Sequence, residues 1–175
     1  MKRRAVLHSL TPEITCIDDA GESVCYVVCG KERAAVIDTV NGKENLKDVV
    51  QEITDLPLVV INTHGHVDHI GGNGYFDEAY IHPADLALYQ EHYAMVPAGL
   101  PSCPLHPIEA GARIDLGGRV LEVVHIAGHT PGSIALLDRR AGYLFSGDAI
   151  NGQLWMQCPE SLKLKDYLKN LEALD

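Results

Sequence analysis

The heptapeptide THGHVDH, residues 63–69, follows directly after the apolar run LVVI, residues 58–61. The run has the length and β-branched composition of a buried strand, so the heptapeptide is expected to form a loop at the end of that strand. Four side chains that can bind a metal ion fall within six residues of this loop: His64, His66, Asp68 and His69. Because side chains alternate along extended backbone, His64 and His66 are expected to point the same way and to grip one ion. After the turn, Asp68 and His69 are expected to face a second position.

Imidazole and carboxylate groups together suit a borderline divalent ion such as zinc, at nitrogen–zinc distances of about 2.0–2.1 Å. The loop is therefore predicted to be a metal site, and the alternative is a solvated polar loop. Two later segments also place a candidate ligand beside glycine. The segment GHTPGS, residues 128–133, contains His129, and the segment FSGD, residues 145–148, ends on Asp148.

These motifs, with the glycine-rich residues 71–73 after the first of them, resemble in type and order the signature of the metallo-beta-lactamase fold superfamily of metal-dependent hydrolases. The resemblance extends from about the first strand to the end of the chain. It implies an α/β fold, a four-layer αββα sandwich of two mixed sheets with helices on both outer faces. It also implies a ligand set: His64, His66 and His129 for a first metal, Asp68 and His69 for a second, and Asp148 bridging the two.

Two zinc ions about 3.5–4 Å apart, with iron or manganese as alternatives, would lower the pKa of a shared water enough to give hydroxide near neutral pH. Asp68 would orient that water and pass its proton to the leaving group. This chemistry predicts cleavage of a small-molecule ester, thioester, lactone or lactam. Residues 66–69 resemble the hydroxyacylglutathione hydrolase and lactonase branches. The residues after Asp148, however, lack the glycine and arginine pattern of glutathione thioesterases, so the sequence identifies no substrate.

Members of the superfamily usually carry one more histidine on a late loop, whereas no histidine follows His129 here. We therefore expect the chain to be a fragment that lacks the last strand and its ligand. A weak second metal site, or a substitute ligand such as His82 or His106, is the alternative. Two rival functions also stay open. One is a mononuclear iron dioxygenase acting on persulfides through His64, His129 and Asp148, and the other is a metal-binding relative without turnover.

Composition and charge indicate the number of domains, the kinds of partner and the location of the protein. The 175 residues are 46% hydrophobic and 22% charged, which predicts one globular domain over residues 1–175. The net charge of −10 argues against a nucleic-acid partner, because such binding needs a basic surface. The basic N-terminus precedes too short an apolar run for a signal peptide, and no run is long enough to span a membrane. We expect a cytoplasmic protein with a small-molecule substrate; the oligomeric state is not predicted.

Five cysteines match no zinc finger or redox pair and are interpreted as small buried side chains, although Cys158 follows Asp148 closely enough to line the site. Alternating apolar residues predict strands over residues 24–28, 34–37, 58–61, 79–81, 113–116, 120–126, 133–137 and 143–145. Helical spacing predicts helices over residues 43–54, 83–94 and 161–174.

Asp38, at the end of one predicted strand, is a candidate partner for a ligand histidine. The proline-rich residues 96–111 are predicted to lack regular structure and to form a rim of the site. Leu100, Leu105 and His106 in that rim are candidate substrate contacts.

Overall fold

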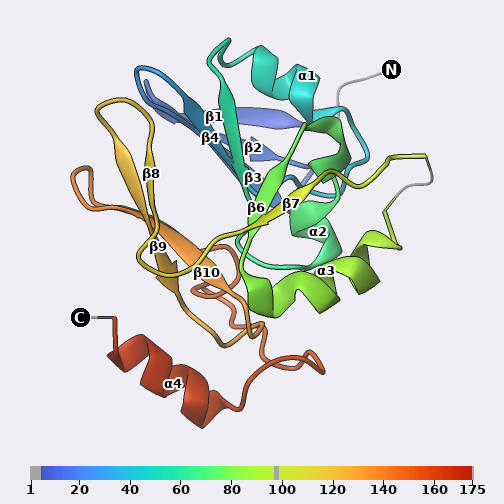
Figure 1. Ribbon diagram of the computed structural model, residues 1–175, viewed down its shortest axis with the longest axis vertical. Coiled ribbons are helices and arrows are strands. Elements are labelled where there is room, and N and C mark those ends of the chain that lie inside the picture. Colours follow the sequence, from blue (N-terminus) through green and yellow to red (C-terminus); the bar gives the residue numbers. More distant parts are fainter. Residues whose placement is uncertain (1–4, 97–98, 175) are drawn as a thin grey trace.

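The computed structural model describes residues 5–96 and 99–174, which form two β-sheets with helices outside them (Figure 1). The strands are β1 (Val6–Thr11), β2 (Ile14–Asp18), β3 (Val24–Cys29), β4 (Ala34–Ile37), β5 (Leu58–Ile61), β6 (Ala79–Ile81), β7 (Leu105–Pro107), β8 (Arg113–Asp115), β9 (Val120–His125), β10 (Ile134–Asp138) and β11 (Tyr143–Phe145). The helices are α1 (Leu46–Gln51), α2 (Val67–Ile70), α3 (Leu86–Tyr93) and α4 (Leu164–Glu172), with 3-10 turns η1 (Asn73–Tyr75) and η2 (Pro83–Asp85).

The seven-stranded sheet has the order β1-β2-β3-β4-β5-β6-β7. Strands β1 to β4 pair antiparallel, and β4 to β7 pair parallel, so this sheet is mixed. The second sheet has the order β11-β10-β9-β8 and is antiparallel over the residues that the structure describes, where a mixed sheet was expected. It is antiparallel because short turns connect its strands, and such turns reverse the chain direction.

The layers follow from which side chains each sheet buries. Between the sheets lies a core to which β4 contributes Ala35 and Ile37, while Ala34 and Val36 face α1 on the other side. Helix α4 covers the second sheet by packing Tyr167 against a cluster around β9 and β10. Figure 1 shows α1 and α4 on opposite sides of the two sheets. The predicted αββα sandwich is therefore confirmed.

The loops that carry the sequence motifs emerge at one edge of this sandwich. Strands β4 and β5 are parallel neighbours, so Asp38 and the loop after Ile61 leave the first sheet on the same side. Strands β9 and β11 both pair antiparallel with β10, so His129 and Asp148 also follow strand ends on a common side. One hydrogen bond joins the two sets, since the Ile134 N–H donates to the Thr63 carbonyl at 2.8 Å.

Several elements differ from the sequence expectation. Strands β1 and β2 were not predicted, and β7 lies inside the stretch that was expected to lack regular structure; residues 97 and 98 of that stretch lie outside the described residues. The first helix is shorter than predicted because the Asn45 side chain accepts hydrogen bonds from Lys47 N and Asp48 N and fixes its start. The predicted helix over residues 83–94 begins as the 3-10 turn η2.

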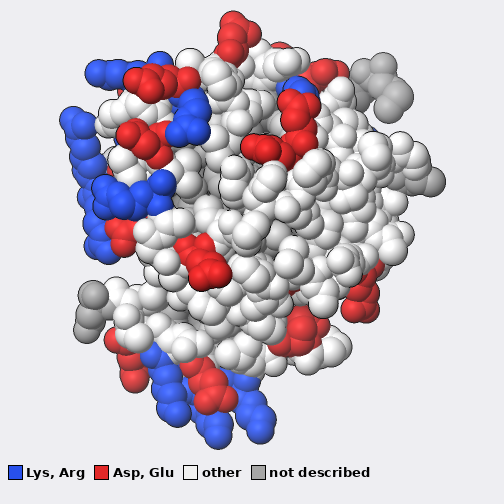
Figure 2. Space-filling view, in the orientation of Figure 1, with Lys and Arg blue, Asp and Glu red and all other residues white. Residues whose placement is uncertain are grey.

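The charged surface is divided into separate areas. In Figure 2, Lys and Arg atoms gather over α4 at the bottom and over hairpin ends at the upper left, with acidic atoms among them. At the hairpin ends, Arg139 pairs with Glu122 and Arg119 pairs with Asp138. Within the described part of the chain, no helix combines the length and apolar character needed to cross a membrane.

Candidate metal centre

Three histidine ring nitrogens converge at the edge where the motif loops meet. His66 Nδ1 lies 3.1 Å from His64 Nε2 and 2.9 Å from His129 Nε2. All three side chains are buried. His64 and His66 come from the loop after β5, as alternation along extended backbone predicted, and His129 comes from the loop after β9. The structure thus brings together residues from both sheets.

The opposite nitrogen of each ring has its own partner. His129 Nδ1 lies 2.5 Å from the Trp155 carbonyl, which can only accept a hydrogen bond. His64 Nδ1 lies 3.1 Å from Thr63 Oγ1, whose hydroxyl donates to Asp38. His66 Nε2 contacts the carboxylate of Glu160. Since each partner accepts a hydrogen bond from the ring N–H that faces it, the other nitrogen of each neutral ring carries a lone pair that points into the cluster.

A second group lies beside the first. His69 Nε2 is 3.6 Å from Asp68 Oδ2 and 3.6 Å from Asp148 Oδ1. The other oxygen of Asp148 lies 3.6 Å from His129 Nε2, so this carboxylate reaches both groups. Asp38 accepts from His69 Nδ1 at 2.8 Å and also from the Thr63 backbone N–H, so it is a partner of a candidate ligand histidine, as the sequence suggested.

The protonation of the histidines differs between the two groups. Burial lowers the pKa of His64, and the neighbouring imidazoles of His69 and His66 lower it further. Burial also lowers the pKa of His66, and the neighbouring imidazoles of His129 and His92 add to this lowering, whereas Glu160 raises the pKa; the net direction is down. At His69, burial again lowers the pKa, but the charge and hydrogen bond of Asp38, together with the charges of Asp68 and Asp148, outweigh burial and raise the pKa to about 9.

The donor set of the first group fits a divalent metal ion. Lone pairs that point at one another across 2.9–3.1 Å repel unless a cation lies among them. Tetrahedral ligands at about 2.0–2.1 Å from zinc would be roughly 3.3 Å apart, close to these separations. Among the described residues, the side chains that could hold an ion form three clusters: His64 with His66 and His129, His64 with His69 and Asp148, and His66 with Cys158 and Glu160. The first two correspond to the two groups described above. Asp68 lies next to the second cluster, with a side chain that is 39% exposed.

A buried carboxylate holds the two histidine loops together. Asp85 ends η2, and its side chain accepts from Gly65 N at 2.9 Å, Thr130 Oγ1 at 2.7 Å and Gly132 N at 2.6 Å. Gly65 separates two of the converging histidines, and Thr130 follows the third. Asp85 therefore fixes the position of one loop relative to the other. Sequence reasoning missed it, since only tertiary contacts distinguish it from any acidic residue near the start of a helix.

The proposed substitute ligands and rim residues lie elsewhere. His82 stacks on His125, with ring centroids 4.2 Å apart, and His106 pairs with Glu78 at 3.0 Å, so neither joins the clusters. Leu105 belongs to β7 and is partly buried against the core. Leu100 lies beside Gly74 on the described part of the stretch.

Three further residues border the centre. The Cys158 side chain forms a possible ligand group with His66 and Glu160, in which the ligand atoms lie within 4.8 Å of one another. The ring of His92 lies 4.8 Å from that of His66, and its Nδ1 accepts from Val67 N. Among these, the sequence pointed only to Cys158.

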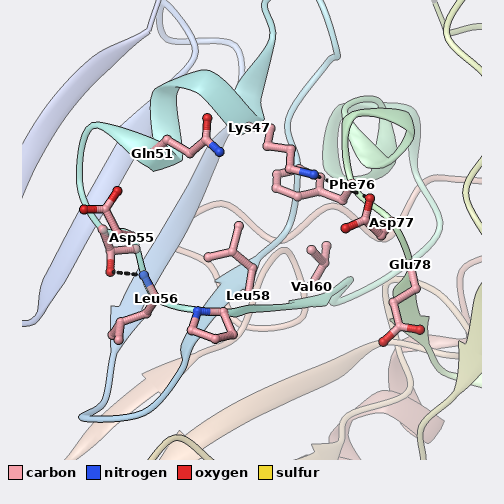
Figure 3. Close-up of a pocket in the computed structure, with 11 residues that line it drawn as sticks. Lys47, Gln51, Asp55, Leu56, Leu58, Val60, Phe76, Asp77 and Glu78 are labelled. Carbon is pink, nitrogen blue, oxygen red and sulfur yellow. Dashed lines mark hydrogen bonds and ion pairs between the residues drawn. The ribbon is translucent and has the colours of Figure 1, made fainter.

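The cavity in Figure 3 is separate from the histidine cluster. It has a volume of about 260 Å³ and is lined by Lys47, Asp77 and Glu78, among others, around the start of β5. His64 and His66 follow the other end of the same strand, His129 follows β9, and none of the three lines this cavity. It therefore takes no part in the metal centre.

Gly147 allows a close approach behind the centre. Its φ is +49°, and a Cβ there would lie 2.3 Å from Thr63 Oγ1. We expect Gly147→Ala to lower the free energy of unfolding by about 2–4 kcal/mol, from the left-handed backbone and from overpacking. Gly142→Ala is the matched control, because Gly142 has φ +74° and open space around it. Urea unfolding measures both, and equal losses would show that the clash with Thr63 has no effect.

Comparison with known proteins gives the following relatives. The sequence model of the metallo-beta-lactamase superfamily matches residues 18–160. The acyl-coenzyme A thioesterase MBLAC2 of Gallus gallus is 30% identical over 184 positions, covering 85% of this chain and 65% of that protein. A hydroxyacylglutathione hydrolase of Synechococcus sp. (strain JA-2-3B'a(2-13)) is 29% identical over 133 positions, covering 74% of this chain and 50% of the enzyme. The chain thus spans only half to two thirds of the length of these relatives.

Solved structures show the same architecture. TTHA1623 in a di-iron-bound form matches with a TM-score of 0.70 and 28% identity, over 97% of this chain and 87% of that one. A metallo-beta-lactamase from Pontibacter korlensis matches with a TM-score of 0.76 and 20% identity, over 97% of this chain and 84% of that one. At 20% identity, the second likeness concerns the fold alone.

Proposed function

Because the chain belongs to the metallo-beta-lactamase superfamily, we propose that it is a metal-dependent hydrolase that cleaves a small-molecule thioester. The observation that carries this proposal is the convergence of the ring nitrogens of His64, His66 and His129 beside the carboxylate of Asp148. Thioesters are favoured over lactones and lactams because one relative is named an acyl-coenzyme A thioesterase, and an acylglutathione is also a thioester.

The residues of the chain divide the work of this reaction. When bound, a divalent ion supplies Lewis-acid polarisation and a water of lowered pKa. Asp148 lies between the two histidine groups, with one oxygen near each, so it could supply a ligand atom to each metal position. Asp68 is partly exposed beside His69, so its carboxylate can accept a proton from the attacking water. Oxygen adds to the carbonyl carbon, the carbon–sulfur bond breaks, and Asp68 returns the proton to the sulfur, which leaves a carboxylate and a thiol.

Zinc is the ion that we propose for the first position. Three neutral imidazoles with an open fourth position are a ligand set of catalytic zinc sites. The imidazole and carboxylate groups of His69, Asp68 and Asp148 suit zinc, iron or manganese at the second position.

The direct test combines metal analysis with a thiol-release assay. Purified protein is analysed for metals per chain, and hydrolysis of acyl-coenzyme A, an acylglutathione, a lactone and a lactam is then compared. We expect kcat/KM for one thioester to exceed the values for the lactone and lactam by about 100-fold, roughly 3 kcal/mol of transition-state binding. Removal of the metal with a chelator should abolish turnover, and added zinc should restore it.

Two outcomes would contradict the proposal. Metal-loaded protein that hydrolyses none of these substrates would indicate a metal-binding relative without turnover. A single iron per chain with oxygen consumption on a persulfide would indicate the dioxygenase, which would use His64, His129 and Asp148.

A further inference from the structure

The segment of residues 155–162 lies against the cluster of His64, His66 and His129. It supplies hydrogen-bond partners to two of these three rings. Besides the Trp155 carbonyl, which accepts from His129, the segment carries Glu160, whose carboxylate contacts His66 Nε2. These contacts lie on the ring nitrogens that face away from the cluster. The segment therefore determines how two of the three converging rings are oriented.

Glu160 is held in place from both sides. Ser161 N donates to the Cys158 carbonyl at 3.0 Å and closes a turn around Glu160. Ser161 Oγ then donates to the His129 carbonyl at 2.8 Å, and Leu162 N donates to the Gly128 carbonyl at 2.8 Å. The loop that carries one converging histidine thus anchors the carboxylate that contacts another.

The negative charge of Glu160 indicates what its contact with His66 does. The side chain of Glu160 is 22% exposed and that of His66 is 10% exposed, so the carboxylate loses much of its hydration. A hydrogen bond from a neutral imidazole N–H offsets little of the hydration free energy that the carboxylate loses. An imidazole bound to a divalent ion is a much stronger hydrogen-bond donor and offsets more of it. A carboxylate on the far nitrogen fixes the ring's tautomer and raises its basicity toward the metal.

We infer that Glu160 is a positioning residue of the metal centre, which orients His66 and strengthens its bond to the ion. This inference rests on the proposed function, because it presumes that the histidine cluster binds metal. It assigns to the segment after Asp148 a role in metal affinity, separate from any contact with substrate.

The experiment measures zinc affinity by competition with a chromogenic chelator, in the parent protein and in four variants. Glu160→Gln keeps an acceptor oxygen without charge, and we expect it to weaken zinc binding about 10-fold; Glu160→Ala removes the acceptor, for an expected loss of about 100-fold. Glu172→Gln, the same change at an exposed glutamate of α4, should leave zinc affinity unchanged. Cys158→Ser tests whether the thiol of Cys158, which lies in the same possible ligand group as His66 and Glu160, binds the metal directly.

A graded loss confined to the Glu160 variants, with metal-free proteins that unfold at the same urea concentration, would support the inference. Unchanged zinc affinity in both Glu160 variants would overturn it and leave the proposed function standing. Loss in Cys158→Ser as large as in Glu160→Ala would also overturn it, by making these two side chains direct ligands. A parent protein that binds no zinc or other divalent metal would overturn the proposed function and the inference together.

Discussion

The Asp85→Ala variant is expected to unfold with a free energy about 3–5 kcal/mol below that of the parent protein, because it removes a buried carboxylate that accepts three hydrogen bonds and leaves two backbone N–H donors without that acceptor. The donors are Gly65 N, Thr130 Oγ1 and Gly132 N, all within 2.9 Å of the Asp85 oxygens. Asp85→Asn is expected to lose about 2–3 kcal/mol, since its amide nitrogen must face one of these donors.

Urea unfolding of the metal-free proteins measures this effect without the contribution of bound metal. Asp77→Ala is the control, because the Asp77 side chain is 95% exposed and its ion pair with Lys47 at 3.5 Å is a surface contact. Its expected change is within about 0.5 kcal/mol. A loss at Asp85 no larger than at Asp77 would mean that the two histidine loops hold their positions without the carboxylate.

The His64→Ala variant is expected to lose the metal of the first group and at least about 10³-fold in kcat/KM for the thioester, since several kcal/mol of transition-state stabilisation go with the metal. His64 belongs to two of the candidate ligand groups, the one with His66 and His129 and the one with His69 and Asp148, so its loss should lower the metal content at both proposed positions. The metal-free variant should still fold, because the substitution also removes repulsion between buried rings.

Thermal unfolding with and without zinc separates the loss of metal binding from any change in the stability of the metal-free protein. The parent protein should gain about 2.7 kcal/mol at a zinc concentration 100 times the dissociation constant, and His64→Ala should gain nothing at that concentration. His8→Ala is the matched control, since His8 is an exposed residue of β1. A His64→Ala protein with full metal content and activity would contradict the proposed centre.

The parts of the fold that the sequence predicted are those with local causes. The β5 strand and the histidine loop after it are adjacent in sequence, and the hairpins β3–β4, β8–β9 and β10–β11 are joined by short turns. Strand β1 was not predicted because its side chains are mostly exposed, and its sequence therefore lacks the alternation of apolar and polar residues that indicates a half-buried strand. Strand β7 contains Pro107 and follows Pro104, which its position at the sheet edge tolerates.

At the centre, the sequence pointed to the residues that lie in motifs and missed those that support them. His64, His66 and His129 were named because their neighbours form recognisable patterns. Asp85 and Glu160 contact the same loops from sequence positions far away, and only the packing of the sheets shows those contacts. His106 was suggested as a substitute for the late histidine that the sequence lacks, but it lies on β7 and pairs with Glu78.

The hydrogen bond from Ile134 N to the Thr63 carbonyl, which joins the two sheets, has a consequence for how the protein folds. Every pair of converging ring nitrogens that includes His129 depends on this docking, because His129 follows β9 and the other histidines follow β5. Contacts between such distant segments form slowly, since a long loop must close first. We therefore expect the nascent chain to bind its metal only after the two sheets have docked. Metal binding would then follow folding and would not nucleate it.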